Sequence, residues 1–321
     1  MIQILRTRKL GLNQIISLAL VLAALAFVAY VLARDGRQLL SQPVRLSLPL
    51  VGLSFVIACS GYFIAVPVWR RILASYGVRQ SWQNDLRIYS YSALALVLPG
   101  GIWNIVSRTA LYGRLGVKGM TVAAASVVET LVSGVAAMAI YSAASLARPE
   151  LTLWKRPEIG ILFSIATLVL IQPRVFNRLI NWAIRKKDPQ AELLQVHFGM
   201  GEMAVWIGLE IGVVAIGGGA MYTLLASLTP VSPAVFLPVA AAWAAAVAAG
   251  NLFFWLPGTP FLRDGAMLLA LTPSLSLPVA VVFVLLIRLW SVASLLVIAG
   301  GVWLGLDLPA RLRRNRPPEA H

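Results

Sequence analysis

Side chains that carry out chemistry are scarce in this sequence of 321 residues. It has one cysteine, Cys59, and two histidines, and only 12% of its residues are charged. One cysteine excludes an intramolecular disulfide, and so few cysteines and histidines exclude a Cys/His metal cluster. A P-loop, a glycine-rich fingerprint after a soluble strand and a Ser/His/Asp set are also missing. We therefore expect no bound metal, no cofactor and no catalytic residue.

Long polar stretches are missing as well. The longest runs from about Arg174 to Phe198, which leaves no room for a large soluble domain. In contrast, 59% of the residues are hydrophobic, and several apolar runs reach about 20 residues, the length that crosses a bilayer. The sequence therefore predicts an all-α polytopic membrane protein.

Six apolar runs predict full membrane spans. The first follows a basic N-terminal segment and is longer than the apolar core of a signal peptide, so we expect it to be retained. The fourth is short. The predicted spans are Leu12–Leu32, Leu46–Val68, Met120–Ala147, Pro157–Ile171, Gly199–Ser227 and Leu275–Leu304.

Two further apolar regions are broken by proline and glycine. Residues 86–115 contain "LPGG" at 98–101, and residues 233–272 contain "LPGTP" at 256–260. Each arm of the first region has about 12 to 14 residues, or about 20 Å of helix against a hydrocarbon core of about 30 Å. We therefore predict two re-entrant hairpins, the second with a longer leading arm.

The distribution of basic residues favours these hairpins. If both return to their own side, 18 of the 27 Lys and Arg residues lie in cytoplasmic segments and six lie outside. If each broken region crossed once, the split would be 14 to 10. The hairpin topology obeys the positive-inside rule better and places both termini in the cytoplasm. The same rule accounts for most of the net charge of +15, so no nucleic-acid partner is expected.

The order of elements repeats along the chain. Residues 1–150 read as two spans, a hairpin and a span, and residues 151–321 read the same before a basic cytoplasmic tail. The second half begins on the opposite side of the membrane, so the two halves form an inverted-topology repeat within one membrane domain. Many secondary transporters use this architecture for alternating access.

The two breaks predict a binding site for an anion. Backbone groups freed by proline and glycine are tolerated inside a membrane when they are buried in protein or line a wet cavity, and half-helix N-termini attract negative charge. Arginines shortly after each break add a donor fork suited to phosphate. The residues expected to bind an anionic lipid headgroup are Gly100, Gly101, Asn104, Arg108, Gly258, Arg263 and Asp264.

Plainer roles remain open for several of these residues. Arg108 would also suit an interface position with its charge in water, Asn104 would satisfy freed backbone groups, and Arg263 with Asp264 would form a local cap. Glu129 and Arg288 lie at matching places, 30 and 31 residues after Pro99 and Pro257. They are candidates for gating or for a structural pair between the halves.

Two other features belong to the same expectation. Glu210 lies deep in the fifth predicted span and is the best candidate for a carboxylate that couples transport to protons. The segment "RVFNRLINWAIRKK" (174–187) places apolar residues at helical spacing opposite basic ones. It predicts an amphipathic helix on the inner leaflet.

Several patches resemble the lysylphosphatidylglycerol synthetase transmembrane-region family of flippase-like proteins. They are "LPGG" followed by Arg108, "RLGVKGMTVAAASVVET" with Gly116 and Glu129, and "LPGTPFLRDGAMLLAL". The chain departs from the family pattern at Thr259-Pro260 and at Asp264, where the family has glycine-rich sequence and Glu. The resemblance implies lipid handling in a bacterial inner membrane, without the synthesis performed by members that carry a soluble aminoacyl-transferase domain.

The expected function is therefore a lipid flippase or transporter. It would move an anionic or lipid-linked headgroup, such as a phospholipid or a polyprenol-phosphate-linked sugar, between leaflets. A non-catalytic subunit that works with enzymes of envelope lipid or polysaccharide assembly is the first alternative. A membrane-embedded glycosyl or acyl transferase is the second, because a carboxylate and cations would suffice for it.

Overall fold

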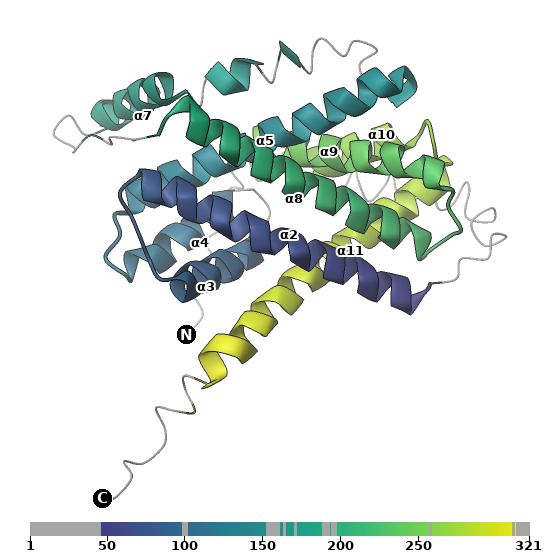
Figure 1. Ribbon diagram of the computed structural model, residues 1–321, viewed down its shortest axis with the longest axis horizontal. Coiled ribbons are helices and arrows are strands. Elements are labelled where there is room, and N and C mark those ends of the chain that lie inside the picture. Colours follow the sequence, from purple (N-terminus) through teal and green to yellow (C-terminus); the bar gives the residue numbers. More distant parts are fainter. Residues whose placement is uncertain are drawn as a thin grey trace, which may run out of the picture.

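The protein is helical throughout the part that the computed structural model describes, which comprises residues 46–97, 102–151, 161–162, 165–169, 172–187, 193, 198–256, 259–309 and 312. Figure 1 shows the long helices crossing one another in one bundle. The α-helices are α2 (Leu48–Ser75), α3 (Trp82–Ala93), α4 (Ile102–Gly113), α5 (Gly119–Ala147), α7 (Pro173–Lys187), α8 (Met200–Ala226), α9 (Phe236–Leu252), α10 (Thr259–Leu271) and α11 (Leu277–Val302). Shorter turns are η1 (Leu94–Val97), η2 (Pro149–Leu151), η3 (Pro233–Val235) and the π-helical η4 (Trp303–Asp307).

Five helices among the described residues are long and apolar enough to cross a membrane, which indicates an integral membrane protein. Four of them, α2, α5, α8 and α11, confirm predicted spans, although α2 continues past Val68 to Ser75. The predicted span Leu12–Leu32 lies outside the described residues, and Pro157–Ile171 is described only in part. The total of six spans therefore stays a prediction.

The fifth candidate span, Pro233–Leu252, combines η3 with α9 and falls in the region predicted as the second hairpin. Its 20 residues rise about 30 Å, which matches the hydrocarbon core. The other arms are shorter, with 12 residues in α3, 12 in α4 and 13 in α10, or about 18 to 20 Å each. Short arms therefore occur on both sides of the first break but only after the second.

Local signals explain where the arms begin and end. Ser81 precedes α3, and its side chain accepts a hydrogen bond of 3.2 Å from the backbone N–H of Asn84, as a helix N-cap does. Gly77 and Gly116 have φ angles of 76° and 78°, in the left-handed region that glycine adopts without strain. They turn the chain sharply after α2 and after α4, so that each short arm folds back towards its neighbours.

Small residues bring α9 close to the helices around it. α9 packs against α5, α8 and α10, while α8 also packs along α2. A Cβ atom on Gly217 of α8 would lie only 2.3 Å from Nε1 of Trp243. Likewise, a Cβ on Gly134 of α5 would lie 2.8 Å from a methyl group of Leu252. Glycine therefore sets the spacing of these helices, as it does in many membrane bundles.

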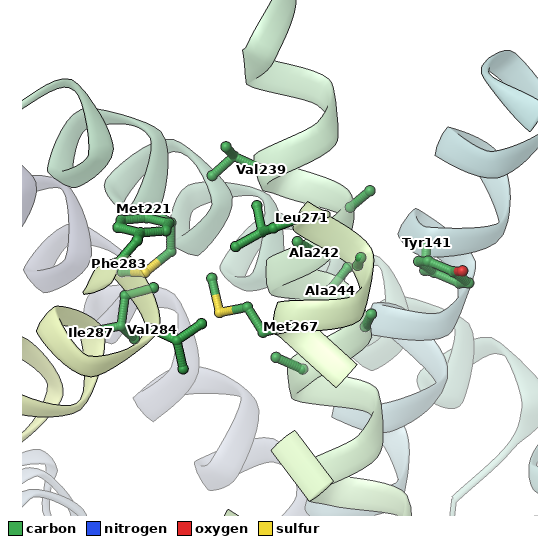
Figure 2. Close-up of a cluster of buried hydrophobic side chains, with 14 of the residues drawn as sticks. Tyr141, Met221, Val239, Ala242, Ala244, Met267, Leu271, Phe283, Val284 and Ile287 are labelled. Atoms are coloured by element: carbon green, nitrogen blue, oxygen red, sulfur yellow. The ribbon is translucent and has the colours of Figure 1, made fainter. Parts of the chain in front are cut away.

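The larger of two apolar cores lies where α8, α9, α10 and α11 meet. Figure 2 shows Met221, Met267 and Phe283 gathered around Leu271, and Leu271 and Phe283 are completely buried. A second core joins the C-terminal half of α2 to α5 and to the start of α8, with Trp69 and Trp206 as its largest buried side chains. The α2 and α8 helices contribute to both.

The helix predicted over 174–187 is confirmed as α7 (Pro173–Lys187). Phe176 on one face is buried in the same core as Trp206, whereas Leu179 and Trp182 are exposed. Arg174, Arg178, Arg185 and Lys186 supply its charge. The helix therefore combines apolar and basic surfaces, as the sequence pattern predicts.

Candidate functional site

Arg108 is enclosed on all sides. It lies on α4 with 2% of its surface exposed, and its Nη1 lies 2.5 Å from Oε2 of Glu129 on α5. Its guanidinium carbon lies 4.1 Å from the ring centre of Trp69 and 4.6 Å from that of Tyr89, and Nε donates a 3.4 Å hydrogen bond to Ser92. These contacts hold the charge inside the protein. The alternative in which Arg108 reaches water at an interface is therefore wrong in this structure.

Glu129, the partner of Arg108, has a second buried carboxyl group, Glu210, in its neighbourhood. Glu129 uses Oε2 for the ion pair, while its Oε1 is buried without a hydrogen-bond partner among the described residues. Glu210, on α8, is 3% exposed, contacts the side chain of Ser133 and lies near enough to Glu129 for their charges to repel. The arginine thus pairs with the nearer carboxyl group, and the cluster of Arg108, Glu129 and Glu210 carries one net negative charge when all three are ionised.

Arg288 pairs with Asp264, and Glu129 pairs with Arg108, so the two candidate gating residues do not pair with each other. Nε of Arg288 donates to Oδ2 of Asp264, and these two side chains are 43% and 25% exposed. The pairing that would join the two halves directly is therefore wrong. The reason is geometric, since α4 packs on α5 and α10 packs on α11, so each long helix meets the arm just before it.

Arg263 has no such partner. Within the described residues it makes no hydrogen bond and no ion pair, and its guanidinium lies over the ring of Trp243, 5.1 Å from the centre. Its Cδ would lie 3.8 Å from a Cβ placed on Gly250, so the aliphatic stem fills the space that this glycine leaves. Asp264 pairs with Arg288, so it does not cap the helix with Arg263. Arg263, Asp264 and Arg288 together carry one net positive charge.

The glycines of the breaks, Gly100, Gly101 and Gly258, lie outside the described residues. Asn104, after the first break, is half-buried, and its Oδ1 is buried without a partner within the described chain. After the second break, the hydroxyl of Thr259 lies 2.8 Å from the carbonyl oxygen of Phe253 and 2.7 Å from that of Leu256. Thr259 therefore ties the start of α10 to the end of the preceding arm, a role that glycine could not fill.

The structure does not give Arg108 and Arg263 a shared contact. Arg108 contacts residues of α2, α3 and α5, and Arg263 contacts α9. What connects the two clusters is α5, because Glu129 holds Arg108 and Gly134, five residues later, packs against the end of α9. The two arginines thus belong to separate clusters, which α5 links through its contact with α9.

Sequence reasoning missed Asp85. This buried carboxylate of α3 accepts hydrogen bonds of 2.8 Å from Nε of Arg70 and 2.7 Å from the hydroxyl of Tyr112. Tyr112 in turn accepts a 2.7 Å bond from the indole N–H of Trp69, whose ring also covers Arg108. In the sequence, Asp85 is the one acidic residue between Arg70 and Arg87. A single carboxylate between arginines was the available signal for an ion pair.

A second missed contact fastens α3 to the end of α11. Nε of Arg87 lies 2.6 Å from Oδ1 of Asp307, and Nη2 donates a 3.2 Å hydrogen bond to the carbonyl of Leu306. The hydroxyl of Tyr91 also donates to Asp307. Both acceptors, the carboxylate of Asp307 and the carbonyl of Leu306, lie in the π-helical η4. The wider π-helical turn directs the carbonyl towards the side chain of Arg87.

The arrangement combines two ion pairs with two charged groups that lack one. The pairs are Arg108–Glu129 and Arg288–Asp264, and among the described residues Arg263 and Glu210 have no ion-pair partner. No group of three or more His, Cys, Asp and Glu side chains suited to a metal occurs in the described ranges. In comparisons with known proteins, no family model and no curated protein matches this chain, so the family resemblance stays a prediction.

Proposed function

We propose that the protein is a lipid flippase that moves an anionic or lipid-linked headgroup between the leaflets of a bacterial inner membrane. The observation that carries the proposal is Arg263. A half-buried guanidinium that rests on an indole ring and has no ion-pair partner among the described residues is suited to an anion. The neighbouring Asp264–Arg288 pair balances itself and leaves the charge of Arg263 available.

Paired helix contacts support the inverted repeat that the proposal requires. In the predicted repeat α5 corresponds to α11, α9 to α3, and α8 to α2. α5 contacts α9 and α8, and α11 contacts α3 and α2, so these two contacts of one long helix have counterparts on the other, whereas the contact of α5 with α2 has no comparable contact of α11 with α8 among the described residues. The contact between α2 and α8 joins corresponding helices. An architecture with such paired contacts has two related arrangements, which alternating access needs.

Short arms support the first of the proposed hairpins. In Figure 1, α3 and α4 lie near the C-terminal end of α2 and near the start of α5. Neither arm is long enough to cross the hydrocarbon core alone. In the proposed topology the first hairpin returns to the cytoplasmic side and the second to the opposite side, which also gives the better distribution of basic residues.

The proposed cycle uses the two charge clusters differently. Arg263 receives the headgroup, while Arg108 stays bonded to Glu129 until the protein changes to its other arrangement. Glu210, buried beside Glu129, carries the proton that couples this change to a gradient. Acyl or polyprenyl tails remain in the bilayer throughout.

Reconstitution in liposomes tests the proposal. We expect headgroup translocation without chemical change, lost in Arg263→Gln and retained in Arg114→Gln, which alters an exposed arginine in the turn after α4. A lipid of altered mass would instead identify a transferase, and activity only with an added envelope enzyme would identify a subunit. Equal loss in both variants would remove Arg263 from the site.

A further inference from the structure

Two adjoining hollows lie where α2 ends and α8 begins. One has a volume of about 360 Å³ and lies between the end of α2 and the start of α3; the other has about 510 Å³ and lies between α2 and α8. Both are lined by Arg71, Ala74 and Arg79. The two guanidinium groups therefore stand at the boundary between the hollows, away from the charge clusters described above.

These two arginines differ from their neighbour Arg70. Arg70 is neutralised by Asp85, whereas Arg71 and Arg79 are exposed and make no hydrogen bond or ion pair within the described residues. The larger hollow contains one acidic side chain, Glu202, and its Oε2 already accepts a 3.1 Å bond from the backbone N–H of Gly199. Two planar cations thus face the space with little competition from acceptors of the protein.

The carbonyl groups at the end of α2 are not available to them either. The carbonyl of Leu73 accepts from the N–H groups of Tyr76 and Val78, and that of Ala74 accepts from Gly77. This closure satisfies the end of the helix internally. Arg71 and Arg79 therefore make no bond to these carbonyls and are open to an acceptor from outside the described chain.

Away from the two arginines, the walls of the larger hollow are apolar. Val205 is 50% exposed on α8, and Trp206 closes the wall beside it. The same core holds Phe176 of the amphipathic α7, whose Trp182 and Leu179 are exposed. Basic groups beside exposed apolar and indole groups are characteristic of a protein surface at the boundary between headgroups and acyl chains.

We propose that Arg71 and Arg79 bind the phosphate of an anionic phospholipid whose first acyl segment lies against Val205. The guanidinium forks offer bidentate bonds to phosphate oxygens, and the hollow of about 510 Å³ accommodates the headgroup. This site is independent of lipid transport, because none of its residues belongs to the clusters around Arg108 and Arg263.

Binding to the full chain in detergent tests the site. Short-chain phosphatidylglycerol, short-chain phosphatidylcholine and inorganic phosphate are each titrated, with bound molecules counted by native mass spectrometry. We expect a clear preference for phosphatidylglycerol, weakened about tenfold in Arg71→Gln and in Arg79→Gln, the loss that one charge-assisted interaction produces. Arg114→Gln, which removes an exposed arginine outside the hollow, should change binding by less than about twofold.

Each contrary result overturns the proposal. Equal affinity of both phospholipids would remove the requirement for an anion, and equal binding of inorganic phosphate would show that no lipid is recognised. Equal weakening in Arg114→Gln would indicate attraction by net charge alone. Since both arginines are exposed and lack partners among the described residues, their variants should fold, and an unchanged melting temperature verifies this.

Discussion

Arg108, on the arm that follows the first break (α4), is bonded to Glu129 on the long helix α5. The same relationship recurs with the charges exchanged, where Asp264 behind the second break is bonded to Arg288. Each pair fastens an arm to its own long helix, and the two halves are joined by apolar packing and by the pair between Arg87 and Asp307. Each of the two pairs is neutral by itself, so the net negative charge of the first cluster comes from Glu210 and the net positive charge of the second from Arg263.

Removing one member of the Arg108–Glu129 pair should strongly destabilise the protein. Arg108→Gln leaves Glu129 buried without a partner, which costs about 3 to 5 kcal/mol. The double variant Arg108→Gln/Glu129→Gln should lose less than the sum of the single losses, as measured by unfolding in detergent. The double variant Glu129→Gln/Arg288→Gln is the matched comparison and should be additive. Energetic coupling between Glu129 and Arg288, together with additivity between Arg108 and Glu129, would contradict these contacts.

Tyr112→Phe should cost about 1 to 3 kcal/mol of unfolding free energy, because it leaves an indole N–H and a carboxylate oxygen short of a bond. Tyr76→Phe is a suitable control. The Tyr76 hydroxyl is buried without a partner among the described residues, so its loss should be neutral or slightly stabilising. Thermal unfolding of both variants measures the difference, and equal losses would refute the network through Asp85.

Gly217→Ala should destabilise the protein by about 1 to 3 kcal/mol, since a methyl group there overlaps Trp243. Gly212→Ala lies in the same helix with no atom within 4 Å of the added group, and should be neutral or stabilising. Because Trp243 also lies over Arg263, Gly217→Ala should reduce headgroup translocation as well. Translocation that is normal in a destabilised Gly217→Ala protein would separate Trp243 from the site.

Cysteine labelling in intact cells distinguishes hairpins from crossings. In a Cys59→Ala background, Ser81→Cys and Arg114→Cys should react from one side of the membrane. Ser232→Cys and Ser276→Cys should react from the other side, because each pair brackets a region that returns to its own face. A broken region that crosses the membrane would place the two members of its pair on opposite sides. Each pair therefore tests one hairpin independently.

Hydrophobic runs were enough to predict the long helices. α5 and α8 begin and end within about one residue of the predicted spans, because apolar runs of that length have few other structures available. The end of α2 was predicted seven residues too early, since Trp69 to Ser75 is amphipathic and stays helical beyond the apolar run. The helix over 174–187 was predicted by its spacing alone.

Partners of the charged residues could not be predicted in the same way. Matching positions made Glu129 and Arg288 candidates for a pair, but a position in a repeat does not say which face of a helix contacts which neighbour. The ion pairs of Asp85 with Arg70 and of Asp307 with Arg87 form only when α3 packs against α2 and α11. Such contacts depend on the relative rotation of helices, and hydrophobicity patterns in one sequence do not specify it.

The composition of α9 has a mechanical consequence. Eight of its 17 residues are alanine, and the buried ones face α5, α8 and α10. Methyl groups interlock far less than leucine or phenylalanine side chains, so sliding along this helix separates few fitted contacts. Resistance to a lengthwise shift of its neighbours is therefore concentrated at Trp243 and Leu252, which lie closely against Gly217 of α8 and Gly134 of α5.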